Sequence, residues 1–188
     1  GEAFDKTAKL LGIEFPGGPK IEEFAKKGDK NYFKLPKPII HKGGCNLSFA
    51  GLKTAVLKIS KKIKNEEEKY HLAASFQKTI EDILCEKSKF AMSLFKENYN
   101  NKKNTFVIAG GVASNNKIRK KLINLSIQKD FEPVFPPANL CSDNAAMIAW
   151  AGIERFKLGL LNKLDFPAKA RWPLDEKAPF LKGAGIKL

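Results

Sequence analysis

Two short segments of this sequence carry residue types that could do chemistry. In the first, FVIAGGVASNNKIRKKL, an apolar run meets Gly110-Gly111 and a helix whose start carries Ser114 and Asn115. Glycines let a ligand approach the backbone, and the free N–H groups of a helical first turn favour anions. Asn115 could add a hydrogen bond to a ribose or a base. The alternative is an ordinary strand–helix turn with Ser114 as the N-cap.

The second segment is Cys141-Ser142-Asp143-Asn144, directly before an apolar helix. An Asp at this place is by default a helix N-cap. A carboxylate at a helix start could also bind a hard or borderline metal ion, but one Asp supplies far too few ligands. Both histidines are isolated, so the sequence has no HxxxH or HExxH motif. On the local pattern the cap is favoured over the metal ligand.

For three further motifs, the local pattern favours an ordinary structural or solvated role. Asp5 of GEAFDK lies within a predicted helix and could simply be solvated. The glycine pair of PGGP (residues 16–19) is typical of a structural turn, although it could line a pocket. In SFAGLKT, Ser48 suits a helix N-cap and Lys53 suits a solvated position better than a phosphate contact.

The first hundred residues are predicted to be mostly helical. Residues 2–11 form a helix that Gly12 ends in a left-handed conformation, and Pro19 starts the next helix at its first position. Residues 32–35 suit a short strand. Two longer helices follow, one from Ser48 and one after Asn65, and their apolar residues recur at three and four positions. These stripes predict a packed helical pair.

From residue 101 the pattern becomes α/β. Residues 105–109 predict a short buried strand and residues 131–135 a second strand, with a helix between them. A last helix, residues 145–159, is apolar on nearly every side and is predicted to be buried, with Gly159 ending it. The tail from Leu160 is interpreted as a loop or surface wrap. The sequence therefore divides into a mainly helical segment, 1–100, and an α/β segment, 101–188.

The charge balance favours a polyanionic partner such as RNA. The formal net charge is +14, from 34 Lys and Arg against 20 Asp and Glu. A general compositional bias towards Lys, Asn and Ile is the alternative explanation. Three cysteines without a CxxC motif fit a reducing compartment. Because the sequence lacks an initiator Met and starts within a predicted helix, a fragment is expected, and any targeting segment upstream would not be seen.

Six ordered motifs together resemble the tRNA N6-adenosine threonylcarbamoyltransferase family, formerly described as O-sialoglycoprotein endopeptidase or glycoprotease. They are GEAFDKTAKLLG, PGGP, SFAGLKT, AGGVASN, CSDNAAMIAWAG and RWPL, and they span essentially the whole chain. The chain resembles the C-terminal half of a bacterial or organellar-type member. The resemblance implies an α/β fold, the second half of the actin-like ATPase, Hsp70 and sugar-kinase architecture, with the helical pair as an insertion.

The resemblance also implies site residues. Asp5, Gly18 and Asn115 should contact threonylcarbamoyl-AMP, and Asp143 should be a ligand of one divalent metal ion per subunit, with iron favoured and zinc the alternative. The family's other metal ligands, an HxxxH pair, belong to its N-terminal half, and neither histidine here aligns with them. The chain alone is therefore expected to be inactive. Ala145, where many members have Gly, weakens the analogy at Asp143 slightly.

The implied reaction transfers threonylcarbamoyl to N6 of adenosine 37 in tRNAs that read ANN codons. Amides of the helix after Gly110-Gly111 would hold the leaving nucleotide, and no general base is assigned. Expected partners are tRNA and, in a bacterium, the dimerising paralogue and small ATPase of the complex, without a membrane. A cytoplasmic location is expected, or a mitochondrial or plastid one for an organellar member. The main alternative is a non-catalytic paralogue of the same fold, which would be expected to lose Asp143; a metalloprotease and a sugar kinase are the others.

Overall fold

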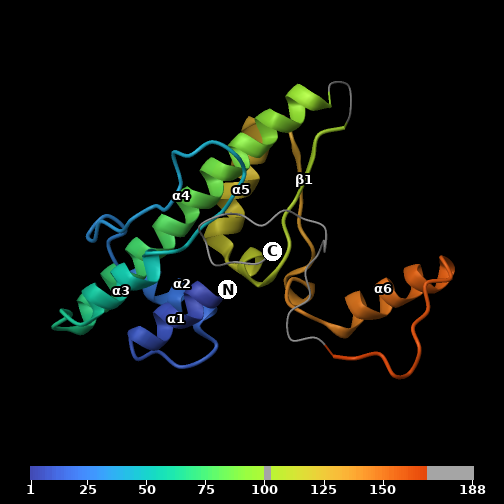
Figure 1. Cartoon of the computed structure of the whole chain (residues 1–188). Coiled ribbons are helices and arrows are strands. Elements are labelled where there is room, and N and C mark those ends of the chain that lie inside the picture. Colours follow the sequence, from blue (N-terminus) through green and yellow to red (C-terminus); the bar gives the residue numbers. More distant parts are fainter. Residues whose placement is uncertain (100–102, 169–188) are drawn as a thin grey trace. The chain divides into compact units, whose positions relative to one another are not determined.

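Helix α4, Glu66–Asn98, is the central element of the helical region in the computed structural model, which describes residues 1–99 and 103–168 (Figure 1). Its start follows from the sequence: the Asn65 side chain accepts a hydrogen bond from Glu68 N at 2.9 Å, and Glu68 Oε2 accepts one from Lys64 N at 2.7 Å. This reciprocal arrangement satisfies N–H groups that a helix start leaves unpaired. The helix predicted after Asn65 is confirmed.

Three shorter helices complete this region: α1 (Glu2–Leu10), α2 (Gly17–Lys27) and α3 (Leu52–Ser60). Gly12 follows α1 with φ of +73°, as predicted. Phe4 of α1 meets Phe76 of α4 edge to face, with ring centroids 5.1 Å apart. Apolar burial of this kind is the main driving force for packing the helices together. The core residues are Phe4, Ala8, Leu11, Ile21, Leu35, Leu52, Val56, Leu72, Ala73, Phe76, Ile80, Ile118 and Leu122.

Three local predictions in this region are wrong. Helix α2 begins at Gly17, so Pro19 occupies its third position, where a missing N–H is still harmless. Residues 32–35 form no strand, because Phe33 N donates to Ser75 Oγ of α4 at 3.1 Å instead of to a neighbouring strand. Gly51, with φ of +80°, precedes α3 as its N-cap, whereas Ser48 Oγ accepts from Ala50 N in a local turn.

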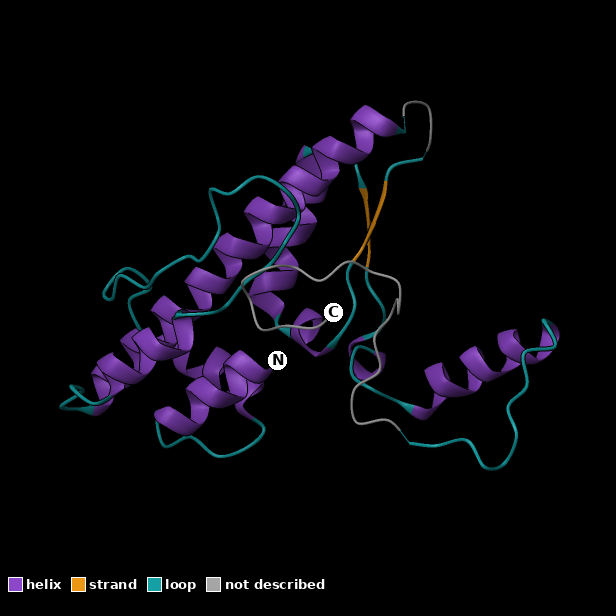
Figure 2. Ribbon diagram, in the orientation of Figure 1, coloured by secondary structure: helices purple, strands orange, loops and turns teal. Residues whose placement is uncertain are grey.

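The α/β region contains two parallel strands, β1 (Thr105–Val107) and β2 (Glu132–Val134). Between them run a 3₁₀ turn, η1 (Gly111–Ser114), and helix α5 (Asn116–Gln128), and a second turn, η2 (Ala138–Leu140), follows β2. Both predicted strands are confirmed in shortened form (Figure 2). The predicted burial of the first strand is wrong, since Val107 is 62% exposed. Alternate strand residues face opposite sides, and in the described ranges α5 covers only one of them.

The chain separates into two units, residues 1–144 and 145–188, and the second contains helix α6 (Ala145–Lys157). The prediction that this helix is buried is wrong: none of its residues is buried, and Phe156 is 70% exposed. Residues 145–168 contain no second helix or strand for α6 to pack against. Gly159 ends it with φ of +69°, as predicted. Residues 160–168 form no regular element, and the rest of the predicted tail lies outside the described residues.

No helix in the ranges 1–99 and 103–168 has the length and apolar character needed to cross a bilayer.

Candidate functional site

Asn115 is the N-cap of α5 and lies at the junction of α5 with α4. Its Oδ1 accepts a hydrogen bond from Ile118 N at 3.0 Å. Asn115 is therefore the N-cap of α5, in place of Ser114, which the sequence offered for that role. Its Nδ2 donates to Gln77 Oε1 of α4 at 2.9 Å. The residue is only 8% exposed. A carboxamide has a second N–H and a second lone pair, so Asn115 keeps capacity for one more partner of each kind.

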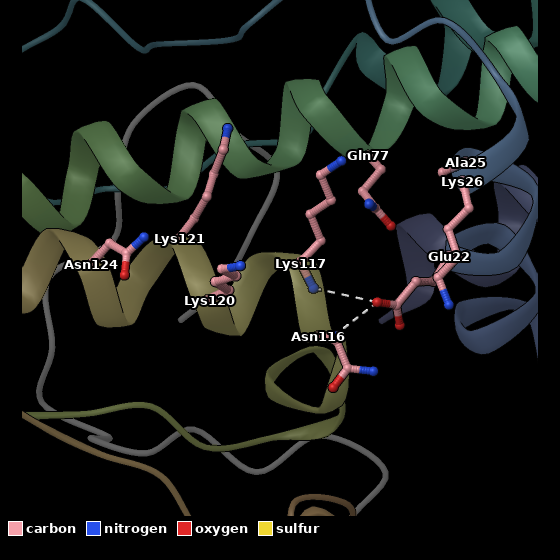
Figure 3. Close-up of a pocket in the computed structure, with 9 residues that line it drawn as sticks. All are labelled: Glu22, Ala25, Lys26, Gln77, Asn116, Lys117, Lys120, Lys121 and Asn124. Atoms are coloured by element: carbon pink, nitrogen blue, oxygen red, sulfur yellow. Dashed lines mark hydrogen bonds between the residues drawn. The ribbon is translucent and has the colours of Figure 1, made fainter.

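The first amides of α5 bind a carboxylate of the protein itself. Glu22 Oε1 of α2 accepts hydrogen bonds from Asn116 N at 2.9 Å and Lys117 N at 3.3 Å (Figure 3). The positive end of the helix dipole favours an anion here, and Glu22 supplies it from 94 residues away. Asn116 N and Lys117 N are therefore already paired within the chain, and the expectation that helix amides after Gly110-Gly111 hold the leaving nucleotide stays a prediction.

A cavity of about 510 Å³ opens beside this contact, between α2, α4 and α5 (Figure 3). We refer to it as the α2–α5 cleft. Carboxamides in its wall can both donate to and accept from base edges, lysines can meet phosphate, and the carboxylate can accept from hydroxyl groups. The lining residues are Glu22, Ala25, Lys26, Gln77, Asn116, Lys117, Lys120, Lys121 and Asn124.

One lysine of the cleft is held by carboxylates of α4. Lys121 Nζ lies 2.8 Å from Glu81 Oε2 and 3.5 Å from Asp82 Oδ1. Burial alone would lower the pKa of Lys121, but the hydrogen bond and charge of Glu81, with the charge of Asp82, outweigh it and raise the pKa. Lys121 is therefore a fixed cation that joins α5 to α4.

Asp5 and the PGGP turn form a second cavity of about 580 Å³, separate in its lining from the α2–α5 cleft. Asp5 Oδ1 accepts a hydrogen bond from Gly17 N at 3.0 Å and so fixes the start of α2. A Cβ on Gly17 would lie 2.6 Å from Ala8 Cβ, so this position needs a glycine for close approach. The lining residues are Glu2, Asp5, Lys6, Ala8, Lys9, Ile13, Phe15 and Gly17.

Gly18 lies in α2 between Gly17, which lines the second cavity, and Glu22, which lines the α2–α5 cleft, and it is in the lining of neither. A Cβ there would meet nothing within 4 Å, so its surface is open to a ligand. Glu22 follows Gly18 by four residues and thus lies on the same face of the helix, one turn nearer α5. Glu22, which lines the α2–α5 cleft, accepts from Asn116 N directly after Asn115, whereas Asp5 lines the other cavity.

The motifs GEAFDK and SFAGLKT meet at two lysines. Partial desolvation and, after it, the neighbouring Lys53 ammonium lower the pKa of Lys6. Lys6 is also paired with Glu2 one turn earlier. Lys53 is exposed, as the local pattern favoured, and lies next to the Lys6 ammonium group, which lines the Asp5 cavity.

Asp143 is exposed, in the segment that Arg119 attaches to the start of α5. Arg119 donates from Nε to Ala113 O at 2.9 Å and from Nη2 to Cys141 Sγ at 3.3 Å. Its guanidinium also lies 4.7 Å from the Phe135 ring centroid. Arg119 therefore joins the AGGVASN motif, through Ala113 O, to the CSDN motif, through Cys141, which lies 22 residues after Arg119.

The donor set around Asp143 fits a metal only in part. An exposed carboxylate is a suitable oxygen ligand for a divalent ion. Throughout residues 1–99 and 103–168, however, no group of three or more His, Cys, Asp or Glu side chains could hold one. Asp143 therefore fits as a single ligand of a site whose other ligands are not among these residues.

Comparison with known proteins identifies the family. The model of the tRNA N6-adenosine threonylcarbamoyltransferase family matches residues 1–150. The enzyme of that name from Pelagibacter ubique is 69% identical over 188 residues, which cover 100% of this chain and 53% of the relative. The chain belongs to the tRNA N6-adenosine threonylcarbamoyltransferase family.

Two more enzymes of this name are similar over the same range. That of Rhodospirillum rubrum is 46% identical over 189 residues, covering 98% of this chain and 52% of the relative. That of Zymomonas mobilis is 48% identical over 187 residues, covering 100% and 51%. The chain thus spans about half the length of the curated relatives it matches. The resemblance seen in the six motifs is confirmed.

Within this member of the threonylcarbamoyltransferase family, three residues of the site were missed by sequence reasoning: Glu22, Gln77 and Arg119. Glu22 had a signal, since it follows Gly18 by one helical turn. Arg119 also had one, because it is one of three arginines among 34 basic residues and follows Asn115 by one turn. Gln77 had none, because a lone polar residue on an apolar helix gives no indication of its partner.

Proposed function

We propose that the protein carrying this chain transfers the threonylcarbamoyl group of threonylcarbamoyl-AMP to N6 of adenosine 37 in tRNAs that read ANN codons. The observation that carries the proposal is the family match over residues 1–150, with Asp5, Gly18, Asn115 and Asp143 in the family's motifs. The names of the relatives supply the reaction, and the chain's own residues supply a cleft of suitable size and chemistry.

The adenosine of the substrate would lie in the α2–α5 cleft. The open surface of Gly18 would let the nucleotide approach the α2 backbone, and the Glu22 carboxylate would accept hydrogen bonds from ribose hydroxyls. The second N–H of Asn115 would donate to the nucleotide. Carboxylate–ribose contacts of this kind recur in nucleotide-binding folds. A cavity of about 510 Å³ is within the usual size range for a small-molecule site.

Asp5 would act at the opposite end of α2. Its hydrogen bond to Gly17 N holds the turn that presents Gly18, and its carboxylate borders the second cavity. Lys6 and Lys53 beside it would attract a negatively charged group. We propose that Asp5 contacts the substrate from this side.

Asp143 would be one ligand of a divalent metal ion, with iron favoured over zinc. When bound, such an ion would orient the substrate and withdraw electron density from it as a Lewis acid. The chain's own contribution is positional: Arg119 attaches the Asp143 segment to the turn that ends in Asn115.

In the reaction, N6 of adenosine 37 in the tRNA attacks the carbamoyl carbon of threonylcarbamoyl-AMP, and a C–N bond forms. The bond from that carbon to the AMP phosphate oxygen breaks, AMP leaves, and N6 gives up one proton. Residues of the cleft would bind and orient AMP through this exchange and exclude water from the carbamoyl group. No general base is assigned among the described residues.

The remaining features follow from the same assignment. We propose that the fold is the second half of the actin-like ATPase, Hsp70 and sugar-kinase architecture, with α3 and α4 as the helical insertion. The lysine-rich surface would bind the tRNA backbone, with an affinity that falls steeply with salt. The bacterial relatives favour a cytoplasmic location and, as partners, the dimerising paralogue and small ATPase of the bacterial complex.

The test is a pair of substitutions in the full-length protein. Asp143→Ala should lower bound metal and transfer together, whereas Asn115→Ala should raise the substrate concentration required while metal stays bound. Asp130→Ala is the matched control, because it removes an exposed carboxylate paired only to Lys96 on α4. Normal metal content and activity in Asp143→Ala would reduce Asp143 to a structural residue.

A further inference from the structure

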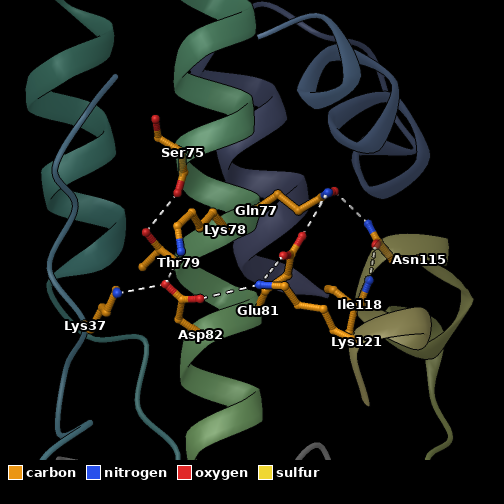
Figure 4. Close-up of polar contacts among 10 residues, drawn as sticks. All are labelled: Lys37, Ser75, Gln77, Lys78, Thr79, Glu81, Asp82, Asn115, Ile118 and Lys121. Carbon is orange, nitrogen blue, oxygen red and sulfur yellow. Dashed lines mark hydrogen bonds and ion pairs between the residues drawn. The ribbon is translucent and has the colours of Figure 1, made fainter. Parts of the chain in front are cut away.

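A chain of buried polar side chains runs from Asn115 into α4 (Figure 4). Asn115 Nδ2 donates to Gln77 Oε1 at 2.9 Å, and Gln77 Nε2 donates to Glu81 Oε1 at 3.2 Å. Gln77 is 4% exposed and Glu81 3%. Buried polar groups in such a network are costly to leave unpaired, so each member constrains its neighbour.

The orientations of the two carboxamides in this network, those of Gln77 and Asn115, are determined from both ends of the network. Glu81 Oε2 is ion-paired with Lys121 Nζ at 2.8 Å, and a carboxylate can only accept. Gln77 must therefore direct its NH₂ group at Glu81 and its oxygen at Asn115. At the other end, Ile118 N can only donate, so it requires Asn115 Oδ1. Both requirements give Asn115 the same orientation, and a flipped carboxamide would break both contacts.

The end of the network away from the cleft is anchored by lysines. Asp82 Oδ2 lies 2.7 Å from Lys37 Nζ and 2.8 Å from Lys78 Nζ, while its Oδ1 faces Lys121 at 3.5 Å. Lys121 therefore bridges the two carboxylates of adjacent α4 residues. Because Lys37 comes from the loop after α2, the network joins three separate segments of the chain behind the cleft.

We propose that Gln77 is a positioning residue for the nucleotide: it holds the Asn115 carboxamide so that its remaining N–H faces the substrate. Gln77 acts through Asn115, with Glu81 and Lys121 fixing its own orientation. This inference rests on the proposed function, because it takes Asn115 as a substrate contact. It adds a residue from the helical region, distant in sequence from the recognised motifs, to the determinants of substrate affinity.

A double-mutant cycle in the full-length protein tests the proposal. Asn115→Ser keeps an oxygen that can cap α5 but removes the amide donor. Gln77→Met keeps length and helix propensity but removes the acceptor for Asn115. Loss of one buried hydrogen bond should raise the KM for threonylcarbamoyl-AMP by about 3- to 10-fold in each single variant, with kcat changed by about twofold or less. The double variant should be no worse than the more affected single one.

The control separates positioning from mere stability. Thr79→Val also removes a buried side-chain hydrogen bond on α4, that of Oγ1 to Ser75 O at 2.8 Å, but it has no contact with Asn115. It should lower thermal stability and leave KM unchanged. If Gln77→Met does not fold, Glu81→Gln serves instead. It replaces a carboxylate that only accepts with a carboxamide that also donates, so the Gln77 amide loses its fixed orientation. KM should rise by about two- to threefold.

The outcomes are distinct. Additive effects of Asn115→Ser and Gln77→Met on KM would show that Gln77 acts independently of Asn115 and would overturn the proposal. An effect of Asn115→Ser with none of Gln77→Met or Glu81→Gln would overturn it while leaving the proposed function intact. No effect of Asn115→Ser would overturn both. Non-additive increases in KM with normal metal content would support it.

Discussion

Helices α4 and α6 are both rich in apolar residues, yet they differ in what the fold does with them. In α4 the apolar face is covered by other helices, and Phe76 is 1% exposed. In α6 the apolar side chains remain exposed, and no residue is buried. Strand β1 resembles α6 in this respect, since Val107 on its outer side is exposed.

The difference shows what an apolar pattern can predict. Periodicity predicts which face of an element is suited to burial, but not whether the covering element belongs to the same stretch of chain. For α4 the covering elements are α2, α3 and α5, together with Phe4 of α1, which packs against Phe76. The stability of the chain should therefore depend on contacts to α4 and hardly at all on α6.

Matched phenylalanines give the largest contrast. Phe76→Ala should cost about 3–5 kcal/mol of unfolding free energy, because it leaves a cavity against Phe4 in the core. Phe156→Ala in α6 should cost about 0.5 kcal/mol or less, as expected for an exposed position. Urea unfolding of the purified chain measures both. Similar losses for the two variants would show that α6 is packed in solution.

Matched glycines come next. A Cβ on Gly28, after the end of α2, would lie 2.0 Å from the Tyr70 carbonyl oxygen of α4, so Gly28→Ala must move backbone and should cost about 3 kcal/mol. Gly152 lies inside α6 and a Cβ there meets nothing within 4 Å, so Gly152→Ala should stabilise the helix by about 0.5–1 kcal/mol. Thermal melts of the two variants, followed by circular dichroism, should shift in opposite directions.

Matched lysines test the polar contacts. Lys121→Met removes the cation next to the buried Glu81 carboxylate and should cost about 1–3 kcal/mol. Lys157→Met removes an exposed pair with Glu154 and a contact of the ammonium with the Trp150 ring at 5.7 Å, both on α6, and its effect should be about 0.5 kcal/mol or less. Equal effects in chemical unfolding would contradict the assignment of Lys121 as a fixed link between α4 and α5.

The smallest expected effect is that of Asp82 on the unfolding free energy at acidic pH. Burial would raise the pKa of Asp82, but the hydrogen bonds and charges of Lys37 and Lys78 outweigh it and lower the pKa below 3.8. A pKa depressed on folding adds stability above the unfolded value, and this stability is lost as pH falls through the folded one. Between about pH 4 and pH 2, unfolding free energy should therefore fall less steeply in Asp82→Asn than in the unmutated chain. Unfolding titrations at several pH values measure how steeply unfolding free energy falls with pH. Lys37→Met should also make this fall less steep.

Much of the helical region could be predicted from the sequence, because its signals are local. The cap at Asn65, the end at Gly12 and the α4 stripe all depend on residues within a few positions of one another. The Phe33 segment could not be predicted, because its backbone pairs with Ser75, 42 residues away. A strand-like composition gave no indication of that partner.

Motifs gave some residues of the candidate site, but not its geometry. Motifs identified Asn115 and Asp143, whereas the local pattern alone offered Ser114 as the cap of the first helix and favoured a cap at Asp143. The occupation of the α5 amides by Glu22 and the fixing of Asn115 by Gln77 both depend on helix packing across many residues. No spacing rule predicts contacts of that kind.

A crystal structure of the full-length protein with threonylcarbamoyl-AMP, or a stable analogue of it, tests the central claim most directly. The account predicts the adenosine in the α2–α5 cleft, against Gly18 and Glu22, with the Asn115 carboxamide donating to the nucleotide and its Oδ1 still on Ile118 N. A nucleotide bound in the Asp5 cavity alone, or with Asn115 turned away from it, would contradict the account.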